Sequence, residues 1–204
     1  MTNARVNPFV LTVNEFLERY QAGERNFAGM GLSRERSGRA IIEDVDLTGV
    51  NLSGADLWGV TFYNCILNHA RMHGARLVNA IFHLVEMDGA DLTCATLVGA
   101  QIRYSSWINV SLQYANLSFA VLDSVDLDSA LLEECNLIRT NLSKISLQQN
   151  GQPYTLYFLR AERAVLWNTI LPSGKNVLGR STSTAVTKEE TLAEAVIKKA
   201  TRES

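Results

Sequence analysis

The feature that most constrains this chain is a strict apolar period of five residues. Every fifth residue from Ile42 to Leu147 is apolar, which makes 22 consecutive positions. Because 47% of all residues are apolar, such a run in one fixed register would arise by chance on the order of once in ten million trials. Neither the repeat of an α-helix nor that of a β-strand keeps a step of five. The period therefore predicts a coiled chain that changes direction at one corner in each pentad.

A second apolar column lies two residues before each of these pentad centres. It holds only compact side chains: eleven Ala, six Val, two Cys, and one each of Ser, Thr and Ile. The residue between the two columns is often Asp or Asn, as at Asp56, Asp91 and Asn116. The two residues after the centre favour Ser, Thr and Gly, which are common in turns. We therefore expect the centre and the compact residue to point inward and the other three residues to face outward.

The pentads have the form A(D/N)Lxx, as in Ala55-Asp56-Leu57. This motif is similar to that of the pentapeptide-repeat family, and the match covers residues 40–147 without a gap. The resemblance implies an all-β solenoid, a right-handed quadrilateral parallel β-helix with one pentad on each side and four in each coil. At a coil spacing of roughly 4.8 Å, the 22 pentads would form about five and a half coils and a rod about 26 Å long.

The chain divides into a repeat region and its flanks. Thr12 and Glu15 are spaced as in a capping box, and apolar residues then recur at helical spacing up to Gly23, which predicts an N-terminal capping helix. The pentad period stops at a turn-rich stretch that contains Gly151 and Pro153. The expected segments are a capping helix in residues 1–24, a β-helix in 25–152, a closing segment in 153–174, and a linker with a short C-terminal helix in 175–204.

The flanks also contain apolar residues at the five-residue spacing. Phe27 and Leu32 already fall in the register of the later pentads, so we expect an incomplete first coil. Beyond the break, Leu166 and Leu171 are five residues apart and would continue the pentads in a shifted register. From Thr187, a short helix with apolar residues on one side would serve packing or homodimerisation.

Composition and charge restrict the function. The formal net charge is -2, without the basic excess that is typical of nucleic-acid-binding and membrane-surface proteins. Residues Met1 to Phe9 hold a single Arg and no long apolar stretch follows them, so we expect no signal peptide, no membrane span and a cytoplasmic location. Three cysteines, Cys65, Cys94 and Cys135, form no CxxC pair, and we expect reduced thiols.

No residue pattern in the sequence indicates catalysis. His69, His73 and His83 are expected to point outward from different sides, whereas metal ligands must converge. Carboxylate pairs such as Glu43-Asp44 are expected on a convex side without a cleft that excludes water. No GxSxG, HExxH, P-loop or GxGxxG motif stands in a suitable context. We therefore expect no enzyme, no metal site and no cofactor.

The charges are unevenly distributed along the chain. Residues 40–147 hold twelve acids and five bases, a net charge of -7, whereas the flanks hold nine acids and fourteen bases. If successive pentads are assigned in turn to four sides, one side collects five acids and no base. We call these acids the acidic face, a candidate surface for a basic partner: Asp46, Glu86, Asp88, Asp126 and Asp128. Alternatively, Asp before a centre hydrogen-bonds to the amides of its own turn.

A second side carries an outward column that is mostly apolar. We call this column the apolar stripe, and its apolar members are Trp58, Val78, Val98 and Ile138. An apolar line along a rod indicates a contact surface. We expect it to be covered either by the protein's own C-terminal segment or by a partner.

Three classes of function remain open. The first, a non-enzymatic protein-protein interaction scaffold or regulator, fits a convex rod without a pocket. The second comes from the resemblance, because quinolone-resistance members of the family resemble duplex DNA in shape and charge and inhibit a type II topoisomerase (gyrase). This chain departs from them in its small net charge and in a basic end at Lys198, Lys199 and Arg202. The third class is a small-molecule binder or an enzyme.

The resemblance also suggests a source. Family members with an ending similar to residues 167–172 are abundant in cyanobacteria, so the chain resembles a cyanobacterial-type member. For partners, we expect another protein, and we expect neither nucleic acid nor a membrane.

Overall fold

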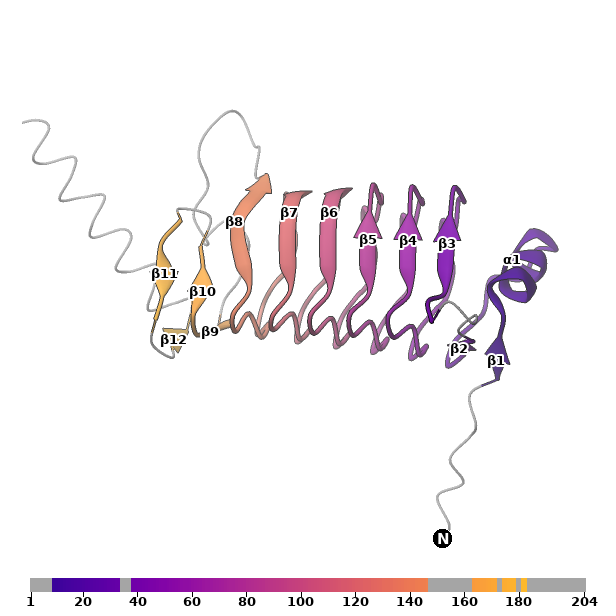
Figure 1. The fold of residues 1–204 in the computed structure, drawn as a ribbon, viewed down its shortest axis with the longest axis horizontal. Coiled ribbons are helices and arrows are strands. Elements are labelled where there is room, and N and C mark those ends of the chain that lie inside the picture. The colour runs from indigo at the N-terminus through magenta and orange to yellow at the C-terminus, as the bar shows by residue number, and fades with distance from the viewer. Residues whose placement is uncertain (1–8, 34–37, 147–162, 172–173, 179–180, 183–204) are drawn as a thin grey trace, which may run out of the picture.

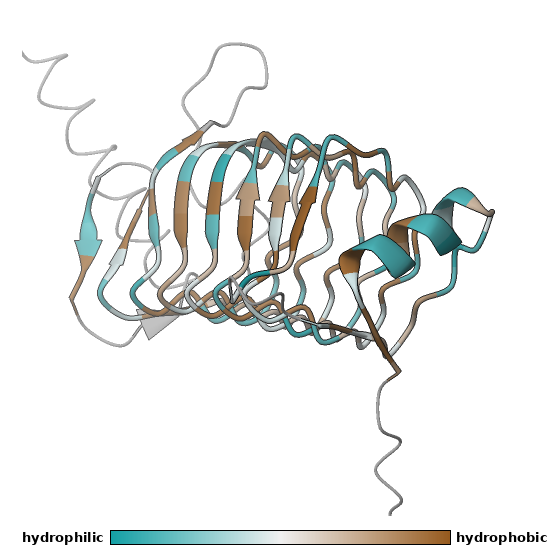
Figure 2. Cartoon of the chain, turned by 45° about the vertical axis from the view of Figure 1, so that its right-hand side comes forward, coloured by the Kyte–Doolittle hydropathy of each residue, from teal (hydrophilic) through white to brown (hydrophobic). Residues whose placement is uncertain are grey.

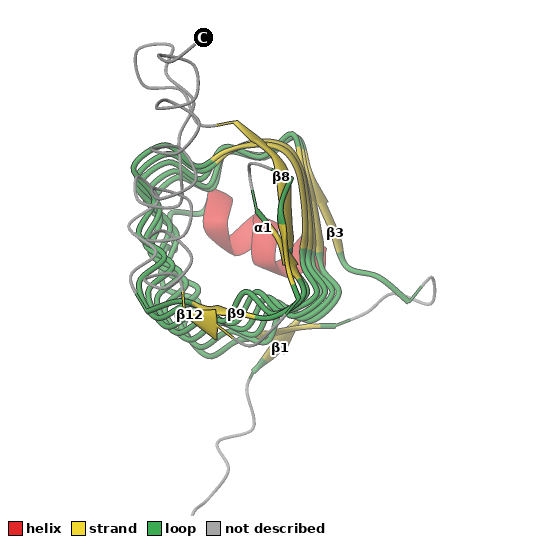
Figure 3. Cartoon of the chain, turned by 90° about the vertical axis from the view of Figure 1, so that its left-hand side faces the viewer, coloured by secondary structure: helices red, strands yellow, loops and turns green. Residues whose placement is uncertain are grey.

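The described part of the chain is a β-solenoid of about seven turns with one short helix near its N-terminus. A computed structural model describes residues 9–33, 38–146, 163–171, 174–178 and 181–182. Figure 1 shows successive coils side by side along the long axis, and Figure 3 shows a four-sided outline along that axis. The solenoid expected from the five-residue period is confirmed.

One side of the rod is a regular parallel sheet. Neighbouring strands in it pair with an offset of twenty residues, as at Ile41, Thr61 and Ile81, apart from a local shift at Asp123. This offset confirms four pentads in each coil. Isolated parallel bridges with the same offset join the coils on the other sides, as from Asp46 to Ile66. The strands of this β-face are β3 (Ile41–Glu43), β4 (Thr61–Tyr63), β5 (Ile81–His83), β6 (Gln101–Ser106), β7 (Val121–Asp126) and β8 (Asn141–Ser146).

The interior of the rod contains the two columns expected from the sequence. Every pentad centre from Ile42 to Leu142 is at most 2% exposed, and Figure 2 shows apolar segments recurring in successive coils. Large rings meet inside, because Phe82 lies 5.4 Å from the stacked ring of Phe62 and 5.3 Å from the edge-on ring of Trp107. Small side chains beside large ones thus fill a narrow cross-section.

The compact column accepts a few polar side chains because they donate to carbonyls of the previous coil. The Thr140 hydroxyl donates to the Leu117 carbonyl at 2.8 Å, and the buried Cys135 thiol donates to the Leu112 carbonyl. Burial raises the pKa of Cys135 to about 12. Cys65 is also buried, and burial likewise raises its pKa. Both thiols therefore act as compact interior groups.

Every regular corner of the rod contains a residue with a left-handed backbone conformation. The residue two positions after the centre has a positive φ in every pentad from Asp44 to Arg139. At the corners outside the β-face, the turn is closed by a backbone hydrogen bond such as that from Val50 N–H to the Leu47 carbonyl, at 3.1 Å. In a type II turn the third of the four residues has a left-handed conformation, which favours Gly or Asn. This preference explains why Gly and Asn are frequent two positions after the centre.

The N-terminal end is closed by the helix α1 (Val13–Gln21), which lies across the end of the rod in Figures 1 and 3. The capping box expected from the sequence is present, because Glu15 N–H donates to Thr12 Oγ1 and Thr12 N–H donates to the Glu15 carboxylate. Phe16 is fully buried, with its ring 4.7 Å from that of Phe27. The strands β1 (Val10–Leu11) and β2 (Gly31–Leu32) pair beside it.

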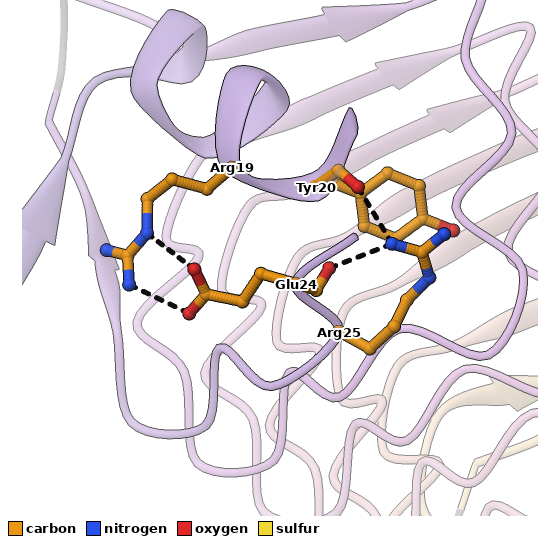
Figure 4. A network of polar contacts seen from close by, with 4 residues as sticks. All are labelled: Arg19, Tyr20, Glu24 and Arg25. Carbon is orange, nitrogen blue, oxygen red and sulfur yellow. Dashed lines mark hydrogen bonds and ion pairs between the residues drawn. The ribbon is translucent and has the colours of Figure 1, made fainter. Parts of the chain in front are cut away.

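A polar network holds the end of α1 against the first coil (Figure 4). The Arg19 guanidinium binds both carboxylate oxygens of Glu24, at 2.7 and 2.8 Å. The Arg25 guanidinium lies 3.9 Å from the centre of the Tyr20 ring and donates to the Tyr20 and Glu24 carbonyls. Because these groups bind one another, we assign the network a structural role.

The C-terminal end is closed by pentads in a shifted register. Val165 bridges to Asn136 and Ile170 pairs with Asn141, so Leu166 and Leu171 continue the interior columns and are fully buried. Antiparallel partners complete this end. The strands are β9 (Val165–Leu166), β10 (Thr169–Ile170), β11 (Asn176–Val177) and β12 (Ser181–Thr182).

Some sequence predictions fall outside the described residues. These are the break at residues 148–153 and the short helix from Thr187, with its role in packing or dimerisation. The four segment boundaries stay predictions. In the part of the chain that the structure describes, no helix is long and apolar enough to cross a membrane.

Candidate interaction surfaces

The five acids of the acidic face do share one side of the rod. The bridges order one outward column as Asp46, Ile66, Glu86, Ser106 and Asp126, and Asp88 and Asp128 lie in the column beside it. Acids in each column are therefore two coils apart, about 10 Å at ~4.8 Å per coil. This spacing keeps the repulsion between carboxylates of one column small, because it is close to the screening length of physiological salt.

Three of these acids also have a structural role. The Asp46 carboxylate accepts from Thr48 N–H at 2.8 Å, and these hydrogen bonds are the main reason why its pKa is lowered. The Asp126 carboxylate accepts from the N–H of residue 128 in the same way, at 3.0 Å. The Asp88 carboxylate accepts from Ile108 N–H in the next coil, at 2.9 Å. The local alternative thus has direct support, and a partner for the acidic face stays a prediction.

The apolar stripe is one continuous line, but it is less exposed than we expected. Bridges from Asp56 through Arg76 and Thr96 bring its members into adjacent coils. All four apolar members are half-buried, and Ser118 between them is only 7% exposed. Coils about 4.8 Å apart shield much of each side chain. The stripe's role in contact stays a prediction.

The three histidines are not brought together as a metal site. His83 stacks on the ring of Tyr63 on the β-face, whereas His69 stands at a corner with a φ of 58°. Among the described residues, no three His, Cys, Asp or Glu side chains are placed to hold a metal ion.

The β-face carries a surface that the sequence reasoning missed. Of the eleven large apolar side chains that are well exposed in the described residues, five stand on this sheet or its corner and are 40–54% exposed. We call this set the β-face patch: Ile41, Tyr63, Leu84, Tyr104 and Val121. Sorting the outward residues of all four sides, and not of two only, would have revealed it in the sequence.

Rings stack along one line of the β-face patch. The ring centroids of Tyr63 and His83 are 5.4 Å apart with planes 4° apart, and Tyr104 meets His83 edge-on, also at 5.4 Å. Because each ring lies one coil from the next, stacking holds exposed side chains in fixed positions. The patch is therefore an ordered aromatic surface.

A shallow notch borders this line of rings at the corner between the β-face and the acidic face. It has a volume of about 370 Å³. β3, β4 and β5 end before this corner, whereas β6, β7 and β8 continue through it. Eight residues line the notch. One rim is formed by Asp44, Asn64 and Leu84, the other by Asp46, Ile66 and Glu86, and the floor by Val45 and Cys65.

A second aromatic cluster stands near the C-terminal end. The Arg139 guanidinium lies 5.4 Å from the centre of the Phe119 ring and 5.9 Å from that of Trp167. Both rings are about half exposed. Arg139 N–H also donates to the Trp167 carbonyl at 2.8 Å, so this cluster joins the closing segment to the last regular coil.

The period, the four-sided coil and the outward columns define a β-solenoid built from pentads. The model of the family "Pentapeptide repeats" matches residues 46–83 and 111–149, in 8 copies. The chain therefore contains the pentapeptide repeats of this family. Among curated proteins, none matches it significantly.

Solved structures with a similar fold include several pentapeptide-repeat proteins. One, from the thylakoid lumen of Arabidopsis thaliana, is 24% identical over 65% of this chain and 84% of its own, with a TM-score of 0.48. Rfr23, from the cyanobacterium Cyanothece, is 22% identical over 66% and 94%, with a TM-score of 0.38. A trypsin-treated QnrB1, a plasmid-mediated fluoroquinolone resistance protein, is 17% identical over 60% and 70%, with a TM-score of 0.40. These likenesses assign no role to this chain.

Proposed function

We propose that this protein is a non-enzymatic rod that binds another protein through its β-face patch. The observation that supports the proposal is the concentration of exposed aromatic and aliphatic side chains on one flat, regular sheet. The pentad centres from Ile42 to Leu142 already form a buried core, so the patch is not required to form it. An exposed apolar surface of this kind is typical of a protein contact.

The fixed positions of the rings in the patch also favour binding. Tyr63 and Tyr104 are held by His83, so a partner would immobilise few additional rotamers. Tyr is also among the residues that contribute most to binding energy at protein interfaces. The regular coils beneath the patch keep the backbone fixed, which suits a scaffold or regulator.

A capture experiment tests this proposal. The native protein and a triple variant, Tyr63→Ser, Tyr104→Ser and Val121→Thr, are used as baits in a lysate of the source organism. We expect a partner that the native rod retains and the triple variant loses. The matched control changes Asp126 and Asp128 of the acidic face to their amides, which leaves the notch unchanged. A partner lost by the control and kept by the triple variant would contradict the proposal.

A second function is favoured by the acidic face. Its five acids have no basic residue beside them in the described columns of that side, so a protein with a basic cleft is a second candidate partner. The most specific form is inhibition or protection of a type II topoisomerase through a surface that resembles DNA. In a supercoiling assay, the native protein would then change topoisomerase activity, and a variant with all five acids changed to amides would not.

A further inference from the structure

We propose that the partner presents an extended basic segment, whose Lys or Arg head enters the notch at the β-face corner while its aliphatic stem packs on Tyr63 and Leu84. This inference rests on the proposed function, because it takes the β-face patch as the binding surface and specifies the chemistry of its occupant.

The shape of the corner is the first argument. The notch follows directly after the stacked rings, because Asn64 and Leu84 in its rim come one residue after Tyr63 and His83. Tyr63 and Leu84 are each 43% exposed. A side chain that crosses from the β-face into the notch therefore passes over apolar surface before it reaches the acids. Lys and Arg have this division between an apolar stem and a charged head.

The charge of the notch is the second argument. Its lining has three carboxylates, from Asp44, Asp46 and Glu86, and no Lys or Arg. The Asp44 carboxylate accepts from the Asn64 amide at 2.7 Å, and that of Glu86 accepts from the Asn68 amide at 3.4 Å. These neutral donors leave the negative charge in place.

Some acids elsewhere on the rod are paired with bases. Asp56 binds Arg76 at 3.0 Å and Asp123 binds Lys144 at 3.3 Å. Within the described residues, none of the notch carboxylates forms such an ion pair. Arg25 is near enough to lower the pKa of Asp46, but its guanidinium is held on the Tyr20 ring. The notch is thus complementary to a cation from outside the described rod.

The spacing of the acids indicates how the segment is arranged. Asp46 and Glu86 are two coils apart, about 10 Å at ~4.8 Å per coil. In an extended polyproline II segment, residues three apart lie on the same side and about 9 Å from each other. A segment with two basic residues three apart would therefore place one head near each end of the notch. The aliphatic stems would then pack on Tyr63 and Leu84, and the charged heads would contact the acids.

A peptide titration tests this inference directly. The probe is a fluorescein-labelled peptide, Gly-Arg-Pro-Pro-Arg-Gly, and the control peptide has Gln in place of Arg. Binding to the full chain is followed by fluorescence anisotropy at low salt. We expect the Arg peptide to bind at least about tenfold more tightly than the Gln peptide, since two charge contacts are lost in the latter.

Two protein variants with the same net charge localise the binding. The notch variant carries Asp44→Asn and Glu86→Gln, and the distant variant carries Asp126→Asn and Asp128→Asn. We expect the notch variant to bind the Arg peptide at least about fivefold more weakly than native, and the distant variant to bind less than about twofold more weakly. Tyr63→Ser should weaken it about threefold through loss of the ring. Circular dichroism checks that each variant is folded.

Equal weakening in the two acid variants would overturn the inference, because binding would then depend on net charge alone. Equal binding of the two peptides would overturn it as well. Neither result would contradict the proposed function, since a neutral partner lost by the β-face triple variant would still support it. Conversely, specific peptide binding with no cellular partner on the β-face would support the notch and contradict the proposed function.

Discussion

The two halves of the rod form the same corner with different residues. From Asp44 to Gly99 the twelve corner positions include six Gly, two Asn and one Asp, whereas the eight from Tyr104 to Arg139 include no Gly and one Asn. The positive φ is nevertheless the same in both halves, between 50° and 71°. A non-Gly residue in this region costs roughly 1–2 kcal/mol. The C-terminal half therefore forms its corners at a greater cost in free energy.

This difference indicates that the backbone conformation alone does not determine which residue type occupies a corner in the C-terminal half. Tyr104, Tyr114 and Phe119 occupy strained corners and are each more than half exposed, so burial does not offset their strain. Strain at exposed aromatic residues points to a role at the surface. Tyr104 belongs to the β-face patch, and Phe119 belongs to the cluster with Arg139 and Trp167.

The largest effect should come from the junction of the two halves, where Trp107 is fully buried against Phe82. Trp107→Ala should lower the free energy of unfolding by about 3–5 kcal/mol, because it leaves a large cavity. Chemical denaturation followed by circular dichroism measures this change. Each coil contacts only its neighbours, so the cavity should also make the two halves unfold less cooperatively.

The matched variant is Trp107→Phe. In the structure the Trp107 Nε1–H is buried without a hydrogen-bond partner, and removing an unsatisfied donor recovers part of the free energy lost with ring volume. We therefore expect this variant to be much less destabilised than Trp107→Ala. Equal destabilisation by the two substitutions would contradict this account.

The second prediction concerns how the interior thiols of the two halves make the free energy of unfolding depend on pH. In the unfolded chain Cys135 ionises near its ordinary pKa of 9.0, but in the folded chain only near 12. The protonated thiol thus favours folding fully below pH 9, and this contribution is lost as pH rises toward 12. At pH 10 the loss is about 1–2 kcal/mol.

The measurement is the free energy of unfolding from pH 8 to 11 for the native protein and for Cys135→Ala. The variant should lose less stability over this range, so the difference between the proteins should shrink as pH rises. Cys65→Ala in the N-terminal half is the comparison, because burial raises the pKa of that thiol as well. A constant difference between native and Cys135→Ala would contradict a raised pKa.

A third effect tests the glycine corners of the N-terminal half. Gly49 has a φ of +71°, and a Cβ added there would meet no atom within 4 Å. Gly49→Ala should therefore lower the free energy of unfolding by about 1 kcal/mol through backbone strain alone. Thermal unfolding measures it. An unchanged midpoint would show that these corners accept other residues without cost, and the contrast between the halves would lose its energetic basis.

Much of this architecture could be predicted from the sequence because every pentad repeats the same local geometry. The inward columns, the offset of twenty and the end closed by Leu166 and Leu171 all follow from one apolar period. The capping helix was predictable because Thr12 and Glu15 form a local box.

The candidate site was harder to predict because it depends on contacts between coils. The notch exists where β3 to β5 end before the corner, and that property is not encoded in a single pentad. The line of rings shifts by one position between His83 and Tyr104, so a search of one outward column does not detect it. The shielding of the apolar stripe likewise depends on neighbours twenty residues away.

The smallest effect should come from replacing an exposed aromatic corner with glycine. Tyr114 is 54% exposed with a φ of 60°, so Tyr114→Gly should raise the free energy of unfolding by about 0.5–1 kcal/mol through relief of strain. Phe119→Gly is the matched control, because loss of its contact with Arg139 should offset a similar relief. Thermal unfolding of both variants tests the comparison. A destabilised Tyr114→Gly would mean that the large corner residues stabilise the fold, and their presence would then need no partner at the surface.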